Sequence, residues 1–537
     1  MNNPFASHLA GLYSRRQSGA NPRIDPEKIR QYKRPFVIYA LPIPGYLTIS
    51  YRTPLRPLAM DVDGRSPERR PSRYSGVIAH LPFAANWSPS SALPPELLSL
   101  VFIYAKPKKR LAHKIPFEVA VSHVCRFWRG VAQRTPELWD RIDIYSKRSN
   151  AWVHPYLERS LQRPLDVYID IYRTDRALSK TINPLTKFDS IIKEFPNHFH
   201  RLRVFSLLCY HQTTAIYWQM IFQDHYAPIL QSFSIKYGSS FSHIQRDFER
   251  FNTILDGGSH DRLTTIETDT PNILPPPENL RNLTTLYLHG LDPSLPISED
   301  KFVEILGSLP SIVNLSLQGT VGFGFWPTGM PSTPQFALNN LKSLRLLDGG
   351  GVAIRMLLTV SALQLESLWL HCSYDNFPTH LFDAAQLTSP EPKFPNLKYL
   401  TIVSENFTMS SQFADIFPNI THLHYHYPNY QEVTELISTF ANRWQSLQVL
   451  VFSAFKAKDA QKLNAALMHI LTRRLNNNPL TKILVDKDHL RWLDRVVPEE
   501  AKKLRQLVQV DLLTIDNYSE YWWNIFERNS GRRLYSD

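Results

Sequence analysis

Cysteine is scarce in this sequence of 537 residues, and long apolar runs are absent. The three cysteines, Cys125, Cys209 and Cys372, lie far apart and form no C-x-x-C pair. This spacing argues against a disulfide framework or a cysteine-ligated zinc module, and it favours a reducing compartment. No run approaches the eighteen or so apolar residues that a membrane-spanning helix needs. We therefore expect a cytoplasmic or nuclear protein, or one present in both compartments, that does not contact a membrane.

Motifs for catalysis are also missing. Asp348-Gly349-Gly350-Gly351 is a glycine-rich turn, but the Lys-Ser/Thr pair of a phosphate-binding loop does not follow it. No H-E-x-x-H, G-x-S-x-G or paired-carboxylate helix motif occurs. The sequence therefore predicts a protein that is not an enzyme and that uses no cofactor.

Positive charge is concentrated near the N-terminus. The formal net charge is +12, and residues 1–89 hold 13 Lys or Arg against 5 Asp or Glu, which leaves +4 for the remainder. This segment is rich in proline and shows no sustained helical period, so we expect residues 1–90 to be a disordered basic tail. Nucleic-acid binding through this tail is one alternative function, although no nucleic-acid-binding motif accompanies it.

Residues 93–139 have the apolar spacing of a small helical module. Pro94 and Pro95 suit the first turn of a helix, because they lack N–H groups that would be unpaired there. Apolar residues recur at helical spacing over 97–105 and again over 117–131, with a basic linker at 106–116 between them. A short third element follows at 136–142. A unit this small needs another structure to cover its remaining apolar surface.

The residues of this module resemble an F-box of the form common among fungal F-box proteins. The matching order is L-P-x-E-L-L-x-x-[IV]-F, then V-C-R-x-W-R-x-[VLI]-A, then P-x-L-W. The resemblance implies docking onto a Skp-type adaptor and, through it, a cullin–RING ubiquitin ligase. The interface, or the packing beneath it, is then expected at nine residues: Leu93, Pro94, Leu97, Leu98, Val101, Phe102, Val124, Trp128 and Trp139. The long basic linker departs from the family pattern and leaves open that the module only caps the rest of the chain.

Eleven segments between Leu202 and Leu480 repeat a short leucine-rich pattern. Each reads L-x-x-[LFI]-x-[LIYF] or a close variant, at a mean spacing of roughly 28 residues. The alternating apolar positions predict a short strand with one buried face, and helical patterns between the strands predict a single parallel sheet. The whole resembles the degenerate leucine-rich repeats that often follow an F-box.

We therefore expect an α/β fold in which a short helical F-box is followed by an irregular leucine-rich-repeat solenoid. Its parallel strands would line the concave face and its helices the convex face. The expected organisation is a tail at 1–90, the F-box-like module at 91–145, a linker at 146–200, repeats at 201–490 and a C-terminal cap at 491–537. Aromatic residues at 521–523 are expected to belong to that cap.

Side chains that alternate with the buried leucines would face the concave side. Tyr, Trp and Arg are enriched in binding hot spots, and an outward-facing Trp is unfavourable unless something covers it. We therefore expect a substrate protein to bind at Tyr287, His289, Arg345, Trp369, His371, His422, His424 and His426. The alternative is that a loop or the C-terminal segment covers Trp369. The alternate histidines predict no metal site, because such side chains stand about 6.5–7 Å apart on a flat strand.

The sequence thus predicts a non-enzymatic adaptor that recruits a substrate protein to a Skp–cullin–F-box ubiquitin ligase. Such an adaptor raises the effective concentration of its substrate beside the ligase and needs no catalytic residue of its own. Besides nucleic-acid binding, the other alternative is a leucine-rich-repeat interaction scaffold outside the ubiquitin system.

Overall fold

The computed structural model describes parts of residues 86–537, the second of two units into which the chain divides. The described residues are 93–107, 115–145, 147–172, 193–223, 225–237, 255, 258, 260–269, 277–288, 304–318, 336–347, 356–357, 359–371, 392–403, 417–426, 444–453, 464–465, 467–468, 471 and 480–514. The expected tail, the glycine turn, the aromatic residues at 521–523 and most of the predicted repeat helices lie outside these ranges. Among the described helices, none combines the length and apolar character that crossing a membrane requires.

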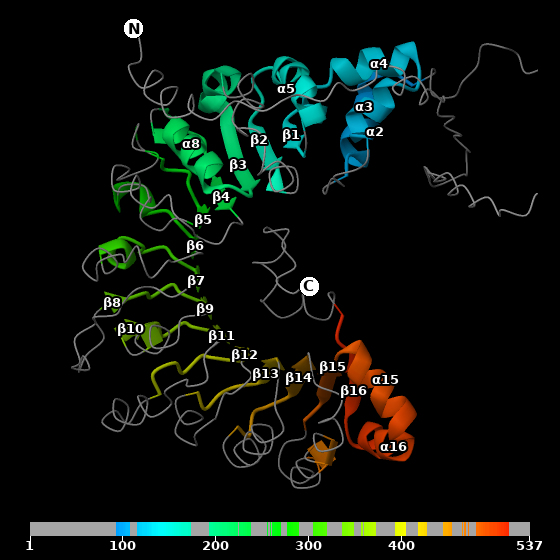
Figure 1. Cartoon of the computed structure of the whole chain (residues 1–537), viewed down its shortest axis with the longest axis vertical. Helices are drawn as coiled ribbons and strands as arrows, with labels where there is room; N and C mark the ends of the chain where they lie inside the picture. The colour runs from blue at the N-terminus through cyan, green and yellow to red at the C-terminus, as the bar shows by residue number, and fades with distance from the viewer. Residues whose placement is uncertain are drawn as a thin grey trace, which may run out of the picture. The chain divides into compact units, whose positions relative to one another are not determined.

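Parallel strands dominate the described part of the chain. Fourteen of the strands described form one sheet in which neighbours in space follow one another along the sequence (Figure 1). They are β1 Arg141–Ile144, β2 Leu165–Asp170, β3 Leu202–Cys209, β4 Ser232–Tyr237, β5 Thr265–Thr268, β6 Thr285–Leu288, β7 Asn314–Gln318, β9 Ser343–Leu347, β11 Ser367–His371, β12 Tyr399–Val403, β13 His422–His426, β14 Val449–Ser453, β15 Lys482–Val485 and β16 Gln509–Leu512. A separate parallel pair joins β8, Phe336–Ala337, to β10, Val360–Ser361.

The sheet extends beyond the eleven segments that the sequence pattern identifies. Each of those segments contains a strand, but β1 and β2 precede them and β16 follows them. In β2, buried Leu165, Val167 and Ile169 alternate with more exposed residues. This alternation of apolar and polar residues predicts a strand, so β2 could have been recognised in the region expected to be a linker.

One face of the sheet forms the hydrophobic core. Leu344, Leu368 and Leu400 occupy matching positions on β9, β11 and β12, and each is fully buried. Leu346 and Leu370 occupy the next inward positions and belong to the same core cluster. The repeated leucines therefore stack strand upon strand, as their alternation in the sequence predicts.

Asparagine side chains connect successive turns ahead of the strands. Asn282 Nδ2 donates to Asp261 O at 2.9 Å, and Asn340 Nδ2 donates to Pro310 O at 2.8 Å. The same bond recurs from Asn396 to Leu363 O at 2.9 Å and from Asn419 to Pro395 O at 2.8 Å. Each asparagine directly precedes the apolar residue that opens its repeat, so each bond fastens one turn to the turn before it. We call these four bonds the asparagine ladder.

The described helices precede the sheet, lie between some of its strands, and follow β15. The N-terminal ones are α2 Pro95–Ala105, α3 Phe117–Ser122, α4 Arg126–Gln133, the 3-10 helix η3 Pro136–Leu138 and α5 Lys147–Arg159. Next come η5 Phe195–Arg201, α8 Gln212–Gln223 and η7 Pro277–Leu280. At the C-terminal end, α15 Lys487–Val496 and α16 Pro498–Leu507 precede β16.

The expectation of one continuous helix over 117–131 is wrong. The chain leaves the helical conformation after Ser122 and begins a second helix, α4, at Arg126. Cys125 has an extended backbone, and its sulfur accepts a hydrogen bond from the Trp128 N–H at 3.4 Å. A side chain that caps the first turn of α4 thus replaces the backbone acceptors that a continuous helix would provide.

Candidate functional site

The two sides of helix α2 differ in their exposure to solvent. Leu98 and Phe102 face the core and are each 1% exposed. Leu97, Val101 and Tyr104 face outward and are 49%, 42% and 87% exposed. The helix is therefore apolar on both sides, although only one side packs within the protein.

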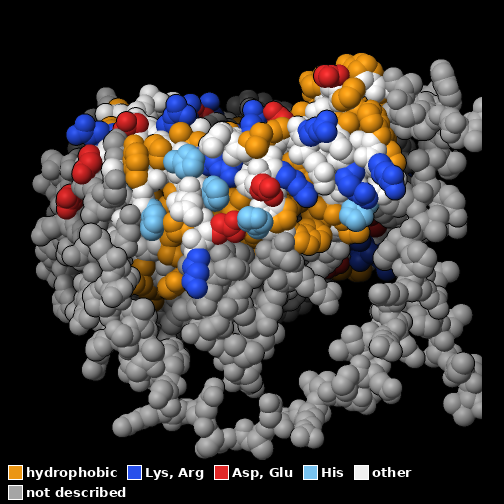
Figure 2. Space-filling view, turned by 90° about the horizontal axis from the view of Figure 1, so that it is seen from above, with side chains coloured by type: hydrophobic (Ala, Val, Ile, Leu, Met, Phe, Trp, Pro, Cys, Tyr) orange, Lys and Arg blue, Asp and Glu red, His pale blue; other side chains and the backbone are white. Residues whose placement is uncertain are grey.

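Further apolar side chains near α2 are exposed as well. We define the apolar face as the exposed hydrophobic residues of this region: Leu93, Leu97, Leu100, Val101, Tyr104, Ile115, Val124 and Phe127. In the space-filling view, hydrophobic side chains gather toward the end at which α2, α3 and α4 lie in Figure 1 (Figure 2). A cluster of exposed apolar side chains is typical of a protein interaction site.

The structure separates the nine residues expected at the Skp interface into exposed and buried ones. Leu93, Pro94, Leu97, Val101 and Val124 are exposed and are available for a partner. Leu98, Phe102 and Trp139 are buried, and Trp128 is partly buried, with its ring 5.0 Å from that of Phe102. The sequence pattern did not include Leu100, Tyr104, Ile115 and Phe127 among the interface residues. Their apolar side chains next to the motif could have indicated them.

Trp139 connects the helical module to the rest of the chain. Its Nε1 donates to Ala132 O at 2.8 Å, and its ring packs edge-on against Tyr156 of α5 at 5.0 Å. The Tyr156 hydroxyl donates to the buried Glu118 carboxylate on α3. Trp139 and Tyr156 therefore link α4, α3 and α5 within the protein interior.

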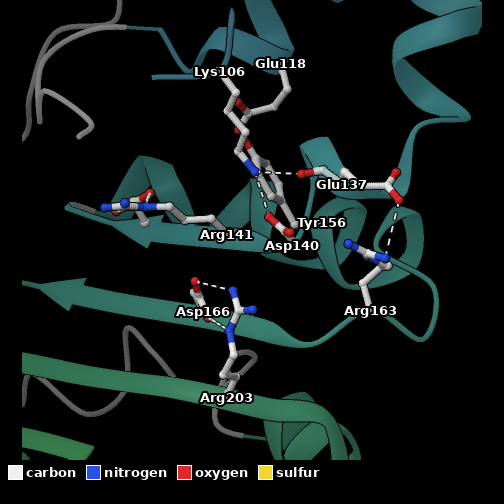
Figure 3. A network of polar contacts seen from close by, with 10 residues as sticks. Lys106, Glu118, Glu137, Asp140, Arg141, Tyr156, Arg163, Asp166 and Arg203 are labelled. Atoms are coloured by element: carbon white, nitrogen blue, oxygen red, sulfur yellow. Dashed lines mark hydrogen bonds and ion pairs between the residues drawn. The ribbon is translucent and has the colours of Figure 1, made fainter. Parts of the chain in front are cut away.

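A set of polar contacts fixes the end of α2 against the turn before β1 (Figure 3). Lys106 Nζ lies 2.7 Å from Asp140 Oδ1 and donates to Glu137 O at 2.8 Å. Arg203 of β3 holds Asp166 of β2 through two hydrogen bonds of 2.8 Å. Lys106, which belongs to the predicted basic linker, thus helps to hold the apolar face in place relative to the first strands.

The sheet face opposite the leucine core carries one continuous row of side chains. In register order, the row is Asp143, Tyr168, Ser206, Ser234, Glu267, Tyr287, Ser316, Arg345, Trp369, Thr401, His424, Val451, Leu484 and Asp511. We call this set the register row. Each of the fourteen strands supplies one residue to it, because the described sheet is parallel and its strands are in order.

The register row brings together four of the predicted substrate-binding residues. Tyr287, Arg345, Trp369 and His424 belong to it, and they are 3%, 4%, 2% and 3% exposed. The Arg345 guanidinium lies 4.1 Å from the centroid of the Trp369 ring. Burial raises the pKa of Tyr287 and holds the pKa of His424 well below its usual value.

The other predicted histidines flank the row. His371, His422 and His426 each lie two residues from a row position on the same strand and therefore on the same face. His289 lies outside the described residues. Substrate binding by all these residues stays a prediction.

Two buried histidines share one hydroxyl group beside the row. His424 Nε2 and His426 Nδ1 lie 2.6 Å and 2.5 Å from Ser453 Oγ. Burial lowers the pKa of His426 to about 4, so its imidazole is neutral at pH 7. Within the described ranges, no group of three or more His, Cys, Asp or Glu side chains could hold a metal ion.

A comparison with protein families identifies the helical module. A family model described as F-box-like matches residues 90–145. A search of curated proteins finds no match to the chain. The matched residues contain α2, α3, α4 and η3, the helices that form the apolar face and the packing beneath it. Residues 90–145 are therefore an F-box-like domain, and F-box domains generally bind Skp-type adaptors of cullin–RING ubiquitin ligases.

Proposed function

We propose that this chain is the substrate-recruiting subunit of a Skp–cullin–F-box ubiquitin ligase. The observation that carries the proposal is the apolar face, which lies within the F-box-like domain and leaves Leu97, Val101 and Tyr104 without cover from this chain. A Skp-type adaptor that covered these side chains would remove their apolar area from water, which is worth about 25 cal/mol per Å².

The mechanism that we propose is proximity rather than catalysis. The chain would hold a substrate protein beside the ubiquitin-conjugating enzyme and so raise the local substrate concentration. The contacts of Lys106 with Asp140 and of Trp139 with Tyr156 support this role, because they hold the docking helices against the turn before β1 and against α5, at the start of the sheet. We propose a cytoplasmic or nuclear location, where this ligase machinery acts.

We further propose that the parallel sheet belongs to an irregular leucine-rich-repeat solenoid of the kind found in fungal F-box proteins. The sequential strand order, the stacked leucines and the asparagine ladder all support a repeat architecture. The register row would then face the concave side and carry substrate recognition.

Binding to a purified Skp subunit tests the proposed function. Leu97→Ser combined with Val101→Ser removes two exposed apolar side chains and leaves the buried Leu98 and Phe102 in place. We expect this double variant to fold, as shown by an unchanged circular dichroism spectrum, and to lose Skp binding in calorimetry. Trp152→Ser is the matched control, because Trp152 is 40% exposed on α5 but lies outside the F-box-like domain.

Two results would contradict the proposal. A folded wild-type chain that does not bind Skp would favour an interaction scaffold outside the ubiquitin system. A double variant that binds Skp as tightly as the wild type would place the docking surface somewhere other than the apolar face.

A further inference from the structure

We propose that three exposed arginines beside the apolar face pair with carboxylates on an acidic surface of the Skp-type partner. The three are Arg126 and Arg129 of helix α4 and Arg134 at its C-terminal end, and we call them the arginine rim. The inference rests on the proposed adaptor function and adds the charge that the partner's contact surface must carry.

The net positive charge that follows the N-terminal segment is concentrated in the F-box-like domain. Residues 90–145 hold 9 Lys or Arg against 5 Asp or Glu, a net charge of +4. Everything after residue 89 also carries +4 in total, so residues 146–537 have no net charge. The docking domain is therefore basic, whereas the part of the chain proposed to bind the substrate is balanced.

Acidic side chains of the domain are paired with other cations, not with the arginine rim (Figure 3). Asp140 Oδ1 lies 2.7 Å from Lys106 Nζ, and Glu137 Oε1 lies 3.4 Å from Arg163 Nη1. Within the described part of the chain, no ion pair involves any arginine of the rim, and all three side chains are exposed. Their charges are therefore available to a partner.

Helix α4 does not balance the charge that it carries. Arg126 is its first residue and Arg129 follows three residues later, a spacing at which like charges repel each other. Positive charge near the N-terminus of a helix is also unfavourable, and α4 contains no acidic residue that would offset it. Carboxylates of a bound partner would relieve both costs.

The arginine rim lies beside the apolar face. Phe127, a member of that face, directly follows Arg126, and Arg134 comes seven residues after Phe127, which returns it to nearly the same side of the helix. The end of α4 contacts α2, because Ser99 Oγ and Thr135 Oγ1 are 2.8 Å apart. Lys and Arg side chains are seen next to the hydrophobic ones at this end of the molecule (Figure 2). A partner that covers the apolar face would therefore also meet the rim.

An acidic protein surface fits this combination better than an anionic membrane does. Apolar and cationic side chains together also occur on helices that bind membrane surfaces. However, the rim lies within an F-box-like domain, and such domains generally bind a protein adaptor. Charges at the edge of a protein interface mainly raise the rate of association and make it depend on salt.

Calorimetry and association rates with a purified Skp subunit, at about 0.05 M and about 1 M sodium chloride, test the proposal. The variant combines Arg126→Gln with Arg134→Gln; Arg129 is kept because its Nε donates to Ser122 O at 3.0 Å. At low salt we expect about tenfold weaker binding, mainly through slower association, because each exposed ion pair changes Kd by about fivefold or less. At about 1 M salt the screening length is about 3 Å, so the variant and the wild type should bind alike.

Arg262→Gln combined with Arg281→Gln is the matched control. Both arginines are exposed, in the turns before β5 and β6, and lie outside the F-box-like domain. This control loses the same charge and should bind Skp as the wild type does at both salt concentrations. Equal weakening in the control and in the rim variant would reduce the effect to net charge and overturn the rim.

The outcomes separate this inference from the proposed function. A folded wild-type chain that does not bind Skp would overturn both. Skp binding with the same affinity and salt dependence in the wild type and in the rim variant would leave the adaptor function standing and overturn the rim. Vesicles of phosphatidylserine and phosphatidylcholine give the membrane test: if the rim variant loses binding to them but keeps full Skp affinity, the rim serves a membrane and the proposal is wrong.

Discussion

Acid should destabilise the protein through the histidine pair beside the register row. His426 is buried, it contacts Ser453 Oγ at 2.5 Å, and burial is the main cause that lowers its pKa from 6.5 to about 4. His371 lowers the pKa of His426 further, and Asp486 acts in the opposite direction. The folded state therefore binds fewer protons than the unfolded state, so stability is lost as the pH falls from about 6.5 toward 4.

The size of this loss follows from the shift in the pKa of His426. A shift from 6.5 to about 4 corresponds to roughly 3 kcal/mol once the pH is well below both values. At pH 5.5 the same shift removes about 1 kcal/mol of the free energy of unfolding. His424 has a lowered pKa from the same cause and shares the same hydroxyl, so it adds to the loss in the same direction.

Urea unfolding at pH 7.5 and at pH 5.5, followed by circular dichroism, measures the effect. The variant His426→Gln has no imidazole at this position, so its free energy of unfolding should fall less between the two pH values than that of the wild type, by about 1 kcal/mol. His123→Gln is the control, because His123 is exposed in the turn between α3 and α4, and it should behave like the wild type. An equal loss in the wild type and in His426→Gln would refute the assignment of this pH dependence to His426.

Two further predictions concern the stability of the F-box-like domain and of the repeats. Leu98→Ala opens a cavity in the core and should cost about 2–5 kcal/mol in urea unfolding, whereas Leu97→Ala should change the same free energy by at most about 0.5 kcal/mol. Asn396→Ala removes the bond to Leu363 O and should cost about 0.5–1.5 kcal/mol; no change would show that this rung of the asparagine ladder adds nothing.

The sequence predicts the strands better than it predicts the surfaces. Alternation of Leu344 and Leu346 around Arg345 sets which side chains face the core, and the structure places them so. No comparable local signal separates Leu97 from Leu98, because both belong to one wide apolar stripe. Which of the two is buried depends on where α4 and η3 pack, and residues distant in the sequence decide that.

Two other features of the structure could not be predicted from the local sequence pattern. The break between α3 and α4 depends on the Cys125 side chain as a cap, whereas the apolar spacing continues unbroken across it. The middle of the register row depends on strand register, which brings Ser316, Arg345, Trp369 and Thr401 together from four strands. Alternation predicts which face each residue occupies, but it does not show which residues of other strands lie beside it.

The register row has a consequence for how this protein could change during evolution. Each strand contributes a single residue to the row, while the leucines on either side of that residue hold the sheet together. A substitution such as one at Thr401 therefore alters one position of the row and leaves the stacking of Leu400 and Ile402 as it was. If the register row binds the substrate as proposed, its binding preference can change one strand at a time, while the F-box-like domain stays under separate selection.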